Sequence, residues 1–146
     1  MTRWNLIAVG VDGSAESRKA LQWACAEAQA HEAEVLAVST WTPPPVPIDP
    51  PFGSFPWGAG TATDSVTEVG KMLTQIVEEV GAAFPGLTIR QHVEAGNAAS
   101  ELIQLSDQAD LIVVGARGHG GFTGMLLGSV SQHVLAHSRC TVAVVR

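Results

Sequence analysis

The sequence has few cysteines and few basic residues. Cys25 and Cys140 are its two cysteines, and their wide separation argues against a disulfide framework or a zinc site, which need more or closely spaced thiols. Lysine and arginine together number 8, against 14 aspartates and glutamates, so the net charge is −6. Because the basic residues are scattered and in the minority, an extended nucleic-acid partner is disfavoured.

Long hydrophobic runs are also absent, although 46 % of the residues are apolar and the mean hydropathy is +0.20. The longest apolar stretches are strand-sized, such as 111–114, whereas a membrane-spanning helix needs about 20 residues. The apolar run near the N-terminus is too short for a signal peptide. We therefore expect a cytoplasmic protein with no membrane contact, in which residues 1–146 form a single domain.

The spacing of apolar residues alternates between that of strands and that of helices. Strands are predicted over 5–11, 35–40, 87–94, 110–115 and 141–145, and helices over 15–31, 64–84, 98–105 and about 129–137. Ser14 and Asn97 are predicted to cap the first and third helices. The wholly apolar strands predict an α/β fold, a doubly wound five-stranded parallel sheet in the order 3-2-1-4-5 with helices on both faces.

In this strand order the direction of winding reverses between the first and fourth strands. Ligands of such sheets bind in the crevice beyond the carboxyl ends of the strands at that point. Residues 10–13 and 115–118 should therefore face each other across a ligand-binding crevice.

A glycine-rich segment from Gly115 to Ser131 joins the predicted fourth strand to the last helix. Glycines let the backbone approach a ligand, and a helix N-terminus presents N–H groups and a favourable dipole to an anion. The segment therefore predicts a site for a di- or triphosphate; a flexible turn in which glycine only permits positive φ is the alternative. Arg117 either neutralises a phosphate there or is solvated.

Two motifs give the chain a family resemblance. Gly115, Gly118, Gly128 and Ser129 meet the spacing G-x2-G-x9-G-S, and the first strand reads Ile7-Ala-Val-Gly-Val-Asp-Gly-Ser14. With both, the chain resembles the ATP-binding members of the universal stress protein family. The resemblance implies a flavodoxin-like fold, bound ATP with Mg²⁺ and a role in stress or dormancy. It also agrees with a homodimer formed through 141–145, an apolar edge strand that would otherwise invite aggregation.

The resemblance implies roles for individual residues. Asp12 and the backbone beside it, at Gly10 and Val11, would contact the nucleoside, and Thr40 would line the adenine pocket where an aliphatic residue is commoner. The ribose and phosphates would be held by Gly115, Gly118, Gly128, Ser129, Val130 and Ser131. On chemistry alone, Asp12 either binds ligand hydroxyls or a water of Mg²⁺, or it caps the turn before the first helix.

The sequence shows no set of nucleophile, oriented base and electrophile, so no catalytic residue is assigned and any ATP hydrolysis or autophosphorylation should be slow. His119 has no evident carboxylate partner. His133 and His137 lack a third ligand, so no metal-ligating residue is predicted. The P-loop pattern GxxxxGK[ST] and the dinucleotide pattern GxGxxG after the first strand are both missing, which excludes those two classes.

Two alternatives to an ATP-binding stress protein stay open: a cyclic-AMP sensor, and a nucleotide-independent chaperone-like or structural dimer. The dimer hypothesis draws on the segment 41–63, which holds every proline except Pro85 together with several aromatic residues. A non-helical loop is expected there, with a lid or a dimer contact favoured over a tolerated insertion.

Overall fold

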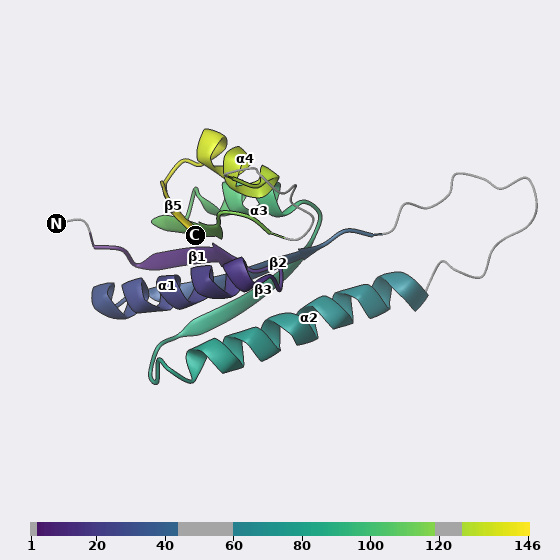
Figure 1. Ribbon diagram of the computed structural model, residues 1–146, viewed down its shortest axis with the longest axis horizontal. Helices are drawn as coiled ribbons and strands as arrows, with labels where there is room; N and C mark the ends of the chain where they lie inside the picture. The colour runs from purple at the N-terminus through teal and green to yellow at the C-terminus, as the bar shows by residue number, and fades with distance from the viewer. Residues whose placement is uncertain (1–2, 44–59, 119–126) are drawn as a thin grey trace, which may run out of the picture.

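The computed structural model describes residues 3–43, 60–118 and 127–146, with side chains from Val66 onward in the second range. Strands and helices alternate along these residues (Figure 1). In chain order the elements are β1 (Leu6–Gly10), α1 (Ala15–His31), β2 (Glu34–Trp41), α2 (Gly60–Gly81), β3 (Ile89–Ala95), α3 (Ala98–Leu105), β4 (Leu111–Gly115), α4 (Ser129–His137) and β5 (Thr141–Val145).

The strands form one parallel sheet in the order β3-β2-β1-β4-β5, which confirms the predicted topology. Helices α1 and α2 cover one face, and α3 and α4 cover the other (Figure 1). The architecture is therefore the doubly wound, flavodoxin-like α/β sheet expected from the sequence.

The sheet separates two apolar cores, and β4 supplies both. Leu111 and Val113 pack into the core under α1 and α2, whereas Ile112 and Val114 pack into the core under α3 and α4. All four side chains are almost completely buried. A strand buried on both faces has no solvent-facing position, which explains why its sequence is apolar throughout.

Side-chain caps start the two helices at the predicted residues. The Ser14 hydroxyl accepts a hydrogen bond of 3.1 Å from the Ser17 N–H at the start of α1. Asn97 Oδ1 accepts one of 3.1 Å from the Ser100 N–H at the start of α3. Each cap satisfies an N–H group that has no carbonyl partner within its helix.

The prediction of a loop over residues 41–63 was wrong at both ends. Trp41 belongs to β2, where it pairs with Ala95 of β3 and accepts a 2.9 Å hydrogen bond from the Gly96 N–H. Helix α2 already begins at Gly60 and ends at Gly81, earlier than the predicted 64–84. Tertiary pairing thus extends the strand beyond its local signal, since β2 lies between two neighbours. A lid or a dimer contact was predicted for this loop. Its residues 44–59 lie outside the part of the chain that the structure describes.

Within the described ranges, no helix is both long and apolar enough to cross a membrane.

Candidate functional site

A cavity of about 260 Å³ opens at the carboxyl ends of β1 and β4, where the strand order reverses. Every residue that the sequence predicts to bind nucleotide lines it: Gly10, Val11, Asp12, Thr40, Gly115, Arg117, Gly118, Gly128, Ser129, Val130 and Ser131. The fold therefore brings the two motifs and the end of β2 to one place, as the switch-point argument predicts.

Hydrogen bonds to β2 fix the chain as it leaves β1. The Val11 N–H donates to the Val38 carbonyl at 2.8 Å, and the buried Ser39 hydroxyl donates to the Val11 carbonyl at 2.6 Å. Gly13, with φ of 87°, then turns the chain into α1. This positive φ is one that L side chains rarely adopt, so glycine is needed at the turn.

The carboxylate of Asp12 holds that turn. Its Oδ1 accepts hydrogen bonds from the Ser14 N–H at 2.9 Å and from the Ser14 hydroxyl at 2.5 Å. The turn-capping role that the sequence left open is therefore present. Because Asp12 also lines the cavity, the same bonds orient the carboxylate toward any ligand there.

Glycine at position 118 makes room for a neighbouring side chain and does not serve a positive φ. Its φ lies outside the positive region, and so does that of Gly115. At Gly118 an added Cβ would overlap Oδ2 of Asp12, and at Gly115 it would lie 3.1 Å from backbone and side-chain atoms of Glu16. These glycines therefore allow the loop after β4 to approach the start of α1 closely, rather than permitting an unusual backbone conformation.

Two predicted phosphate-binding residues, Gly128 and Ser131, also hold the connection between β4 and α4. The Gly128 N–H donates to the Ala116 carbonyl at 2.6 Å. The hydroxyl of Ser131, which is 1 % exposed, lies within donating distance of the same carbonyl, at 3.1 Å, and of the Gly128 carbonyl, at 2.9 Å. Both groups thus make internal bonds that position the helix.

Helix α4 begins at the cavity without a side-chain cap on its N-terminus. The N–H groups of its first turn, at Ser129, Val130 and Ser131, have no carbonyl partner within the helix. All three residues line the cavity. The positive end of the helix dipole therefore meets the cavity and favours an anion there.

Arg117 is already paired. Its backbone N–H donates to Glu16 Oε2 at 3.1 Å, and its guanidinium lies 3.8 Å from Glu16 Oε1. The Arg117 side chain is 47 % exposed. Its positive charge is therefore partly balanced by Glu16, a contact that the sequence did not reveal because the two residues are 101 positions apart in the chain.

The rest of the cavity lining is largely apolar, and most of it was not predicted from the sequence. Val38 of β2, Met72 of α2 and Leu102 of α3 lie there. Their only sequence signal is the amphipathic pattern of their elements, which does not distinguish a pocket wall from the core. The full set of missed lining residues is Ser17, Val38, Val69, Met72, Ala98, Leu102 and Val114. The cavity thus combines apolar side chains with the N-terminus of a helix.

The histidines considered in the sequence do not contribute to this site. His119 lies outside the described residues. His133 and His137 lie side by side on α4, with ring centroids 4.8 Å apart and ring planes tilted by 45°, and neither lines the cavity.

The fold and cavity define a doubly wound α/β domain with a pocket at its switch point. The model of the universal stress protein family matches residues 4–146, and the chain belongs to that family. Universal stress protein Rv2623 of Mycobacterium tuberculosis is 34 % identical over 140 residues, which are 96 % of this chain and 44 % of that protein. A universal stress protein of Mycolicibacterium smegmatis is 34 % identical over 141 residues, 96 % of this chain and 45 % of that protein. The chain therefore spans less than half the length of these relatives.

Solved structures of the same family share the fold. Universal stress protein UspA from Lactobacillus plantarum has a TM-score of 0.81 at 22 % identity, with each chain covered completely. A universal stress protein in complex with cAMP has a TM-score of 0.73 at 26 % identity, with 99 % of each chain covered. The protein from Archaeoglobus fulgidus in complex with dAMP has a TM-score of 0.65 at 17 % identity, covering 99 % of this chain and 100 % of that one.

Proposed function

We propose that this chain is a binding module for an adenine nucleotide, ATP with Mg²⁺, formed by one domain over residues 1–146. The supporting observation is the cavity at the switch point, whose lining combines apolar side chains with the uncapped N-terminus of α4. Few common metabolites combine a flat, weakly polar ring with a strongly anionic end, and nucleotides do so.

The phosphates would lie at the start of α4. Backbone N–H groups of Ser129 and Val130 would donate to phosphate oxygens, and the helix dipole adds a favourable field for negative charge. Gly115 and Gly118 let the loop after β4 pack closely against Glu16 and Asp12 beside the cavity. Arg117, paired with Glu16, would contribute little charge.

The adenine ring would lie against the apolar wall of Val38, Met72 and Leu102. Burial of a purine face against aliphatic side chains removes apolar surface from water, at roughly 25 cal/mol per Å². Thr40, also in the lining, adds a hydroxyl group at the end of β2.

Asp12 fits the cation that accompanies the phosphates. Magnesium prefers carboxylate oxygens and water as ligands, and the Asp12 carboxylate is oriented by Ser14 at the edge of the cavity. Mg²⁺ would neutralise phosphate charge, with Asp12 holding it directly or through a water.

We expect binding rather than rapid turnover, because the acidic side chains near the cavity are already held by neighbouring residues. Asp12 is engaged by Ser14 and Glu16 by Arg117, so neither is positioned as a general base by the contacts described. Hydrolysis or autophosphorylation would then be slow. A cytoplasmic location forms part of the proposal, because both cysteines are free thiols, as in reducing compartments.

A cyclic-AMP sensor is the second candidate, favoured by one observation. The solved universal stress protein in complex with cAMP is 26 % identical to this chain over nearly its whole length. Cyclic AMP has the same base but a single phosphate. Its base would make the same contacts with the apolar residues, and its phosphate would make fewer contacts with the N-terminus of α4.

Thermal unfolding with ATP, ADP, cyclic AMP or GTP tests the proposal, with and without Mg²⁺. A ligand at 100 times its Kd adds about 2.7 kcal/mol to the apparent free energy of unfolding. We expect stabilisation by ATP and ADP, larger with Mg²⁺ for ATP, and less by GTP. Stabilisation by cyclic AMP alone would support the sensor. No effect of any adenine nucleotide, together with no nucleotide released on denaturing the purified protein, would favour the nucleotide-independent dimer.

A further inference from the structure

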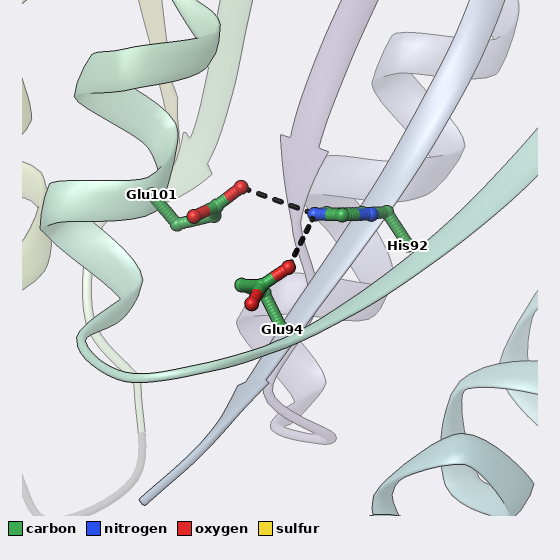
Figure 2. A group of neighbouring side chains, drawn as sticks. All are labelled: His92, Glu94 and Glu101. Atoms are coloured by element: carbon green, nitrogen blue, oxygen red, sulfur yellow. Dashed lines mark hydrogen bonds and ion pairs between the residues drawn. The ribbon is translucent and has the colours of Figure 1, made fainter.

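Three side chains able to bind a metal ion meet between β3 and α3, outside the cavity (Figure 2). His92 and Glu94 come from β3, and Glu101 comes from the first turn of α3. His92 Nε2 lies 3.1 Å from Glu101 Oε1 and 3.6 Å from Glu94 Oε2. One donor atom of each residue falls within 4.8 Å of the other two. Figure 2 shows both carboxylates directed at the same imidazole nitrogen.

The backbone holds these side chains in place. His92 pairs with Val38 of β2 and Glu94 pairs with Thr40, so both stand on the face of the sheet that α3 covers. The Asn97 cap then starts α3 immediately after the strand, which brings Glu101 over His92. The cluster is therefore assembled by a strand ladder and a capped helix, not by a loop.

The cluster has more negative charge than its own groups can balance. One imidazole nitrogen faces two carboxylates, so it can donate a hydrogen bond to one of them at a time. Even a protonated His92 leaves a net charge of −1. Of the lysines and arginines in the described ranges, none forms an ion pair with Glu94 or Glu101; Arg90, on the same face of β3, pairs with Glu34 at 3.1 Å. A divalent cation would balance both carboxylates.

We propose that His92, Glu94 and Glu101 bind a divalent first-row transition metal ion, with Zn²⁺ as the representative. Zinc takes imidazole nitrogen and carboxylate oxygen ligands at about 2.0–2.2 Å, so tetrahedral ligand atoms lie about 3.4 Å apart. The two distances from His92 Nε2, 3.1 and 3.6 Å, bracket this separation. The Glu94 side chain is 49 % exposed and can rotate to complete the site, and water would fill the fourth position.

The ligand set also predicts which cations are excluded. Imidazole suits zinc, nickel and copper, whereas magnesium and calcium prefer sites made only of oxygen. The ligands of the proposed zinc site therefore differ from those that hold the Mg²⁺ proposed to accompany a nucleotide. The zinc site also needs no nucleotide to form.

A purely structural role is the competing interpretation. Glu101 lies in the first turn of α3, where a carboxylate interacts favourably with the helix dipole, and a hydrogen bond to His92 would suit that role. If this interpretation holds, replacing His92 or Glu101 should change the free energy of unfolding but not the affinity for a metal ion.

Zn²⁺ titration of tag-free, chelator-treated full-length protein, in competition with a chromophoric chelator, separates the two interpretations. All proteins carry His133→Ala and His137→Ala, which remove the neighbouring histidines of α4 as a second binding place. We expect one Zn²⁺ per chain and at least tenfold weaker binding in His92→Gln and in Glu101→Gln. Glu34→Gln is the matched control on neighbouring β2 and should bind Zn²⁺ as the parent does. Circular dichroism verifies the fold of each variant.

An NMR measurement on the parent protein does not depend on any variant folding. Substoichiometric Zn²⁺ should shift the ring nitrogens of His92 in a ¹⁵N-edited spectrum, and an excess of Mg²⁺ should not. Zn²⁺ affinity unchanged by His92→Gln, or a His92 ring that does not respond to Zn²⁺, would overturn the proposal. Either result would leave nucleotide binding untouched, since none of the three residues lines the cavity.

Discussion

Gly118 and the carboxylate of Asp12 are packed so closely that a Cβ at position 118 would overlap Oδ2 of Asp12. Ser14 holds the same carboxylate through Oδ1. The aspartate-bearing turn after β1 and the glycine-rich segment after β4 are therefore one unit, in which a change in one segment must displace the other.

Gly118→Ala should weaken ATP binding by about tenfold or more while the protein stays folded. The new methyl group can be accommodated if the Asp12 side chain swings away, which breaks its hydrogen bonds to Ser14 and removes it from the ligand. Gly70→Ala is the matched control, because a Cβ there would meet no atom within 4 Å and Gly70 does not line the cavity. Calorimetric titration of both variants measures the difference. Equal ATP affinity in the two variants would show that the contact between residues 118 and 12 does not shape the site.

Arg117→Ala should reduce ATP affinity by less than about threefold. The Arg117 side chain is 47 % exposed and its charge is shared with Glu16, and exposed ion pairs typically contribute only about 0–1 kcal/mol. Arg139→Ala, which removes an exposed arginine paired with Asp107 at 2.6 Å, is the control. If Arg117→Ala abolishes binding in the same titration while Gly118→Ala binds normally, the phosphates are held by a side-chain charge and not by backbone groups.

The buried thiol of Cys25 should make stability fall in alkaline solution. Burial raises the pKa of Cys25 to about 11, above its value in the unfolded chain, so the native state holds the proton longer. The stabilisation is complete below about pH 8.5 and is lost as the pH rises toward 11, at about 1.4 kcal/mol per pH unit.

Urea unfolding across this pH range measures the effect in a Cys140→Ser background, since burial also raises the pKa of Cys140. Cys25→Ala is the control and should lose less free energy of unfolding between about pH 8.5 and 11. The chain has no tyrosine, so no phenol titrates in the same range. The same pH dependence with and without Cys25 would contradict the prediction.

A homodimer through β5 is the fourth prediction. Among the described strands, β5 pairs only with β4 and forms one edge of the sheet. An unprotected apolar edge favours pairing with a second chain. Sedimentation at micromolar concentration should show a dimer, and the amide groups of β5 should exchange more slowly as the protein concentration rises. A monomer whose β5 amides exchange at a rate independent of concentration would contradict it.

The sequence was sufficient for the order of the strands and for the caps at Ser14 and Asn97. These features depend on local signals: an apolar strand buried on both faces, a polar residue just before an amphipathic segment, and the handedness of strand crossovers. The position of the cavity followed from the same topology. The residues predicted to bind nucleotide do meet there, because carboxyl ends of adjacent parallel strands share one edge of the sheet.

Tertiary structure alone decided what each of those residues does. Gly118 is required by the Asp12 carboxylate and not by its own φ, and Ser131 bonds to the Ala116 carbonyl inside the loop. The cluster of His92, Glu94 and Glu101 likewise has only a short H-x-E pattern on a strand as its sequence signal. Such contacts join atoms from elements distant in the chain, and their distances depend on how strands pair and helices pack. Local propensity carries no information about those distances, so the sequence by itself determined where the site lies, and packing decided its chemistry.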